Sequence, residues 1–155
     1  MKKIALVASH LAMLAIGFAA GVYVLPILIA PEPPDASEVK SVAGAAQFTG
    51  QFRRDLKGSD ILHWGEGTVS VGRKAISLAG RVAPGPDYKL YLAPEFVDTE
   101  EAFLRVKAQS LRVGDVKTFE NFIVPVPDGT DLTRYNTVVV WCERFSMFIS
   151  AAKYR

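Results

Sequence analysis

Cysteine and histidine are scarce in this chain of 155 residues, and their scarcity excludes several kinds of site. The single cysteine, Cys142, leaves no C-x-x-C pair for dithiol chemistry and no C-x-x-C-H segment for covalent haem attachment. Tetrahedral zinc takes three or four Cys, His or carboxylate ligands. Beyond the N-terminal segment the only histidine is His63, so a zinc site would have to be completed by carboxylates. No H-E-x-x-H, P-loop or G-x-S-x-G segment is present either.

An excess of charge of one sign is also lacking. Lys2 and Lys3 precede a hydrophobic run, and the remaining 16 basic residues are balanced by 16 acidic ones, all beyond residue 30. No stripe of Lys and Arg suited to a phosphate backbone is found, and the pair Arg53-Arg54 is typical of a solvated strand end. Nucleic acid is therefore not an expected partner.

The first thirty residues form a hydrophobic segment, almost unbroken from Ile4 to Ala30. A helix over residues 4–25 would be about 33 Å long, which is close to the thickness of a hydrocarbon core. Lysines on its N-terminal side favour a cytoplasmic N-terminus and a periplasmic or extracellular C-terminal domain. The alternative is a signal peptide, cleaved near Gly17-Phe18-Ala19, which would secrete the domain. Because the hydrophobic run continues past that point, we favour a single-pass membrane anchor over residues 1–30.

Residues 31–46 are rich in proline and alanine and follow the anchor directly. Pro31, Pro33 and Pro34 predict an extended, semi-rigid linker that holds the next domain away from the membrane. The folded domain is expected over residues 47–155.

That domain is predicted to be all-β. Short runs of β-branched and aromatic residues recur between Gly, Pro and Asp, as in "QFTGQF", "TVSV", "AISLAG", "YKLYLAP", "NFIVPV" and "TVVVWC". One helix is predicted over residues 98–106, with Asp98 or Thr99 as its N-cap and Phe103 and Val106 on one face. Strands at this spacing predict a small antiparallel sandwich or barrel with one short helical insertion, preceded by the transmembrane helix.

Cys142 ends the valine-rich run, and two interpretations of it stay open. Strand alternation places Val138, Val140 and Cys142 on one face of the strand, where a buried thiol would act as a small inert hydrophobe. The polar residues that follow suggest instead a position at the rim, where Arg144 would lower the pKa of the thiol and leave it open to oxidation.

Two further segments carry side chains of interest. In "DILHWGEGTV", His63 is either a metal or haem ligand or the cap of a turn. In "APGPDYKLYLAP", the Pro and Gly residues predict a tight turn, and Asp87 either starts the next strand or meets a ligand.

These segments together resemble the DM-thirteen (DM13) domain family, also called the electron-transfer DM family, over roughly residues 47 to 154. The similarity lies in "GQF" at 50–52 and in "HWGEGTVSV", "GPDYKLYL" and "YNTVVVWCERF". The positions that match the family's motifs are His63, Gly67, Gly85, Pro86, Asp87, Tyr135, Trp141, Cys142 and Phe145.

The resemblance implies a mostly β domain with a redox-active Cys142, either as a free thiol or as a ligand of a prosthetic group. Animal relatives join this domain to DOMON and b-type cytochrome domains. We therefore expect a membrane-anchored extracytoplasmic redox or electron-transfer domain, not a turnover enzyme, with a redox protein as partner. Haem or copper would be held by Cys142 and His63, and a cofactor-free thiol is an equal alternative. The other class of function is a binding or adhesion module with a structural Cys142.

Overall fold

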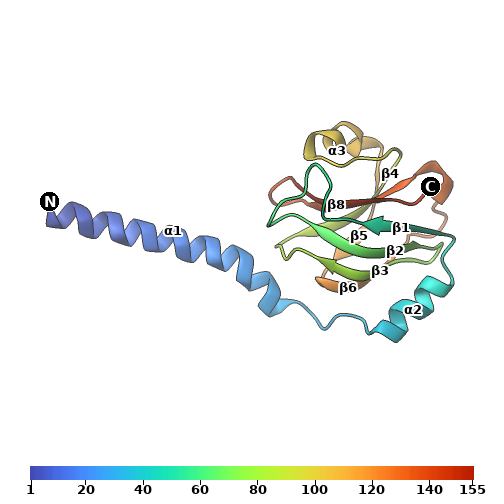
Figure 1. Ribbon diagram of the computed structural model, residues 1–155, viewed down its shortest axis with the longest axis horizontal. Coiled ribbons are helices and arrows are strands. Elements are labelled where there is room, and N and C mark those ends of the chain that lie inside the picture. The colour runs from blue at the N-terminus through green and yellow to red at the C-terminus, as the bar shows by residue number, and fades with distance from the viewer.

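Helix α1 (Lys2–Ile29) projects from one end of a two-layer β domain (Figure 1). The structure is a computed structural model and describes all residues, 1–155. The side chains of α1 are almost all exposed. This helix is long and apolar enough to cross a membrane, a property that a signal sequence shares. The predicted N-terminal hydrophobic helix is confirmed.

Eight strands form two antiparallel sheets, which confirms the predicted all-β fold and shows that it is a sandwich and not a barrel. The first sheet has the order β1-β2-β3-β6, with bounds Phe48–Phe52, Gly65–Val71, Ala75–Val82 and Glu120–Pro125. The second has the order β5-β4-β7-β8, with bounds Leu111–Val116, Tyr88–Ala93, Thr137–Cys142 and Met147–Lys153. Two short 3₁₀ helices, Lys107–Gln109 and Leu132–Arg134, lie in the connections before β5 and before β7.

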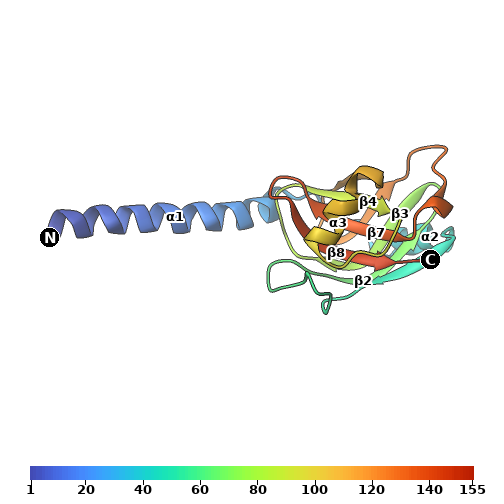
Figure 2. The same cartoon turned by 90° about the horizontal axis from the view of Figure 1, so that it is seen from above.

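Strand β7 is buried on both faces. Val138, Val140 and Cys142 belong to the core between the sheets, as strand alternation predicts. Val139 and Trp141 belong to a second core on the outer face of that sheet, covered by helix α3 (Glu100–Val106) (Figure 2). Cys142 therefore lies in a strand with no face open to solvent.

Helix α3 is the helix predicted over residues 98–106. Thr99 is its N-cap, and the Thr99 hydroxyl accepts a hydrogen bond from the backbone N–H of Ala102 at 3.2 Å. Phe103 and Val106 are buried, as their spacing predicts. The two glutamates of its first turn are favourable beside the positive end of the helix dipole.

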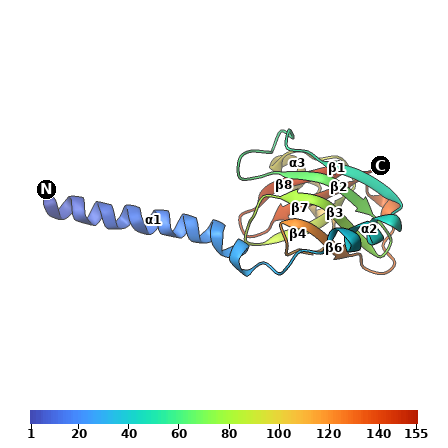
Figure 3. The ribbon, with the colours of Figure 1, turned by 60° about the horizontal axis from the view of Figure 1, so that its bottom comes forward.

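The linker differs from its predicted extended form. Residues 31–35 are without regular structure, but helix α2 (Ala36–Gly44) follows and packs against β3 and β6 through the buried Val39. Asp35 caps this helix, because its carboxylate accepts the backbone N–H of Glu38 at 2.8 Å. The proline run masked this start signal. The linker crosses the domain and reaches α2 at the end remote from α1 (Figure 3).

Several turns of the sandwich meet near α1. Strand β7 ends opposite the first residue of β4 and the first residue of β8, because Cys142 pairs with Tyr88 and with Met147. Strand β2 begins at the same end, after the turn that contains His63. The C-terminus lies at the opposite end of the domain (Figure 1). This topology gathers the chemistry-bearing turns beside the hydrophobic helix.

Candidate functional site

Cys142 and His63 line one cavity of about 300 Å³ between the turns of the sandwich and α1. Most of its lining is hydrophobic, and it also includes Gly85, Pro86 and Phe145. The structure thus brings together five of the positions that the sequence singled out, from three separate segments of the chain.

The Cys142 side chain is buried, with 2 % of the residue exposed. Burial raises the pKa of its thiol above the ordinary value, and backbone N–H groups of Phe145, Asp87 and Arg144 offset this in part. Of the two interpretations of Cys142, burial in the core is therefore the one that the structure supports, and an exposed position at the end of the strand is not. Arg144 contributes through its backbone N–H, and the net direction of the pKa of Cys142 is upward, opposite to the lowering expected for a thiol beside the Arg144 charge.

His63 is held by a carboxylate that the sequence analysis missed. Its Nδ1 lies 2.8 Å from Asp60 Oδ2, and Asp60 Oδ1 accepts the backbone N–H groups of Leu62 and His63 at 2.7 and 2.8 Å. The hydrogen bond with His63 lowers the pKa of Asp60. A carboxylate beside Nδ1 favours the tautomer with its proton there, which leaves the Nε2 lone pair free. An aspartate three residues before the histidine was the available signal.

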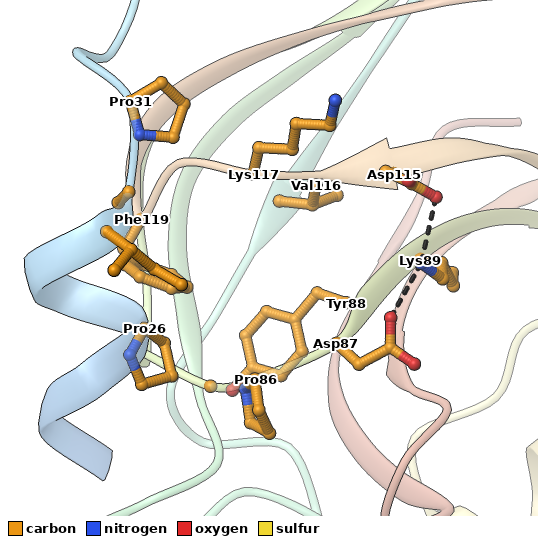
Figure 4. Close-up of a pocket in the computed structure, with 13 residues that line it drawn as sticks. Pro26, Pro31, Pro86, Asp87, Tyr88, Lys89, Asp115, Val116, Lys117 and Phe119 are labelled. Atoms are coloured by element: carbon orange, nitrogen blue, oxygen red, sulfur yellow. Dashed lines mark ion pairs between the residues drawn. The ribbon is translucent and has the colours of Figure 1, made fainter. Parts of the chain in front are cut away.

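The turn before β4 fits tightly around Tyr88. A Cβ atom on Gly85 would lie 2.3 Å from the Tyr88 hydroxyl, so only glycine leaves room for this buried ring. The Asp87 carboxylate pairs with Lys89 at 2.7 Å, and Lys89 pairs with Asp115 at 3.0 Å, in a neighbouring pocket (Figure 4). The Asp87 carbonyl accepts the backbone N–H of Glu143 at 3.0 Å. Asp87 therefore positions the turn that follows Cys142.

Gly67 and Trp141 lie away from the cavity and have structural roles. Gly67 has a φ of +119°, and a Cβ atom there would lie 2.3 Å from the carbonyl oxygen of Ala79. Trp141 is fully buried in the second core, where its ring centroid lies 4.9 Å from that of Phe103. These two positions support the sandwich itself.

Residues 51–154 match the family model described as electron transfer DM13. The chain belongs to the DM13 family. No curated protein and no solved structure matches it. The match runs from β1 through β8, so the strands and turns around the cavity belong to the DM13 domain, whereas α1 and α2 precede it. The resemblance drawn from the sequence motifs is confirmed.

The other residues of the DM13 domain that line the cavity include Tyr88 and Met147. Both pair directly with Cys142, from the strands on either side of it. Burial raises the pKa of the Tyr88 hydroxyl, and Met147 adds a thioether to the thiol and the imidazole of the cavity. Sequence reasoning missed them because strand register, not spacing along the chain, makes them neighbours.

The donor atoms of the cavity fit some metal groups and not others. No group of three or more His, Cys, Asp or Glu side chains surrounds a common point, which does not fit a zinc centre. A thiol, an imidazole and a thioether are soft or borderline donors, and such donors suit copper and haem iron. The cavity therefore offers a thiol, an imidazole and a thioether in its lining, without the set of ligands that a zinc site needs.

Proposed function

We propose that this protein is a membrane-anchored electron-transfer domain whose redox centre lies in the cavity lined by Cys142 and His63. The observation that carries the proposal is that a thiol and an imidazole line the same apolar cavity. They come from the end of strand β7 and from the turn before β2, which are far apart in the sequence. Apolar cavities with a few convergent polar groups are the usual form of cofactor sites.

Cys142 is better suited to bind a metal than to react as a free thiol. Free-thiol chemistry requires the thiolate, and a buried thiol with a raised pKa stays protonated near neutral pH. A bound metal displaces that proton, so burial does not oppose ligation. The backbone N–H groups of Phe145, Asp87 and Arg144 would then stabilise the thiolate and tune the potential of the centre.

His63 has the surroundings of a metal ligand. Ligating histidines usually donate their second ring N–H to a carboxylate, which fixes the ring and raises its basicity. Asp60 provides this carboxylate, at 2.8 Å from Nδ1, and its two backbone contacts hold it in place. The Nε2 atom of His63 and the sulfur of Cys142 would hold the cofactor, with Met147 as a third donor. A haem or copper group would supply one-electron reduction and oxidation there.

The anchor would be α1, with the DM13 domain outside the cytoplasm. Lys2 and Lys3 flank the helix on its N-terminal side, which favours that orientation. A redox protein in the same compartment, or in the membrane, would exchange the electron.

The test is an absorption spectrum of the full chain, extracted from its native membranes and recorded before and after dithionite. We expect bands that change on reduction, and we expect Cys142→Ala and His63→Ala to alter or abolish them. Ile149→Val is the matched control, because Ile149 lines the same cavity without a donor atom. Haem and copper–thiolate centres differ in their bands, so the spectrum also identifies the group.

A colourless protein would refute the proposal. The burial of Cys142 in the core equally suits a binding or adhesion module in which the thiol only packs. A colourless chain that remains folded would favour that second function.

A further inference from the structure

Large hydrophobic side chains are exposed on two turns of the DM13 domain that lie beside α1. Ile61 is 91 % exposed, Leu62 is 53 % exposed and Phe145 is 50 % exposed. We call these three residues the rim. Elsewhere in the domain, the large hydrophobic residues with comparable exposure are Phe96 and Leu104. A cluster of this kind on a small domain usually marks a surface that contacts a partner or a membrane.

The position of the rim along α1 indicates what covers it. Phe145 shares a surface cavity with Phe18, Val22 and Leu25 of the helix, and Leu62 shares the Cys142 cavity with Phe18 and Val22. At 1.5 Å per residue, Phe18 lies about 21 Å and Leu25 about 32 Å along the helix from Ile4. A hydrocarbon core that starts near Ile4 is about 30 Å thick. Leu62 and Phe145 therefore face the part of α1 that meets the outer boundary of the hydrocarbon, and Ile61 directly precedes Leu62 in the same turn.

The charged residues next to the rim are compatible with a position at the outer boundary of the hydrocarbon. Arg144 is exposed, precedes Phe145 and lines the groove beside Leu25. An arginine at this level places its aliphatic stem against lipid and its guanidinium among the phosphates. The only carboxylate beside Ile61 in sequence is that of Asp60. Asp60 is exposed, but its carboxylate is already hydrogen-bonded to His63 and to two backbone N–H groups.

We infer that the rim is seated in the outer leaflet of the bilayer, so that the Cys142 cavity faces the membrane surface. The inference rests on the proposed role of α1 as the membrane anchor, and it adds a second attachment made by the β domain. Interfacial apolar groups of this kind commonly reach about 5–10 Å into the boundary between headgroups and acyl chains. An electron donor or acceptor would then approach the cavity from the plane of the membrane.

The experiment uses the full chain in liposomes with a nitroxide label on a single new cysteine. Ile61→Cys reports on the rim, and Leu104→Cys on α3 is the matched control, because Leu104 is a similarly exposed aliphatic residue outside the rim. The wild-type chain, with its buried Cys142, sets the background labelling. The depth of each label is measured by power-saturation EPR with oxygen, which is enriched in lipid, and with a nickel chelate, which stays in water.

We expect the Ile61→Cys label to collide mainly with oxygen and to be shielded from the nickel chelate, and the Leu104→Cys label to show the reverse. Equal access of nickel to both labels, in chains that float with the liposomes, would overturn the inference and leave the anchor intact. Dipolar broadening at Ile61→Cys would overturn it in favour of contact with a second copy of the chain. Chains that do not float would refute the anchor itself, whereas the redox proposal is tested separately by the absorption spectrum.

Discussion

Replacement of Cys142 by serine is expected to destabilise the protein whichever function it has. The sulfur lies in the core between the sheets, paired across β4 and β8 with Tyr88 and Met147. Serine puts a hydroxyl into that apolar site, and a buried polar group without full compensation costs about 1–3 kcal/mol. The backbone N–H groups that approach the sulfur from Phe145, Asp87 and Arg144 can donate to the new oxygen. We therefore expect a loss of about 1–2 kcal/mol.

Cys142→Ala provides the comparison. Removing one buried heavy atom costs about 1 kcal/mol, as for Ile→Val, and introduces no polar group. For a domain of this size 1 kcal/mol corresponds to a change in Tm of roughly 4–8 °C, so serine should lower Tm by roughly 4–16 °C and alanine by roughly 4–8 °C. Thermal unfolding of the full chain in detergent, followed by the far-UV signal of the strands, measures both.

The pH dependence of the same pair gives an independent measurement. In the cofactor-free protein, burial raises the pKa of the Cys142 thiol above its ordinary value, so the folded chain keeps a proton that the unfolded chain releases. The advantage of wild type over Cys142→Ala should be complete below pH about 8, and it should shrink as the pH rises through the folded pKa. A serine variant as stable as wild type, or an advantage that does not change up to pH about 10, would refute the burial argument.

Three other substitutions test the sandwich and the cavity. Gly67→Ala should cost more than about 2 kcal/mol in denaturant titrations, because a positive φ is combined with a backbone oxygen 2.3 Å from the new Cβ. Gly85→Ala should cost about 1–3 kcal/mol by overpacking against Tyr88, and a variant as stable as wild type would show that this ring moves freely. Asp60→Asn should lower the amount of cofactor retained on purification by about 10–100-fold, because His63 loses its carboxylate partner. An unchanged amount of retained cofactor would show that His63 does not take part in cofactor binding.

The sequence predicts the strands well because a pleated sheet has a period of two. The alternation of Val138, Val139 and Val140 correctly assigns each face of β7 without any knowledge of the partner strands. Helix α3 is equally readable, because its cap and first-turn glutamates are local signals. Helix α2 was not predicted, because three prolines precede its cap and dominate the local pattern.

The cavity is less accessible to sequence reasoning. Cys142 and His63 were singled out separately, but their shared cavity depends on where β2 begins and where β7 ends in the assembled sandwich. Burial of Cys142 also depends on the packing of the two sheets, whereas its polar neighbours in the sequence suggested an exposed strand end. The similarity of motifs identified the positions, but only the tertiary packing determines which of these residues lie side by side.

Helix α2 has a consequence for how strongly the β domain would be coupled to α1 in the proposed membrane-anchored form. Val39 is buried against the first sheet, and the Asn121 side chain donates a hydrogen bond to the carbonyl of Pro34 at 3.3 Å. The linker is thus docked along the domain, and few free residues remain between α1 and the β sandwich. A short, docked tether keeps the local concentration of the rim at the bilayer far above that of an untethered domain. In the proposed anchored form, contacts too weak to recruit an untethered protein would therefore be sufficient to hold the rim at the membrane surface.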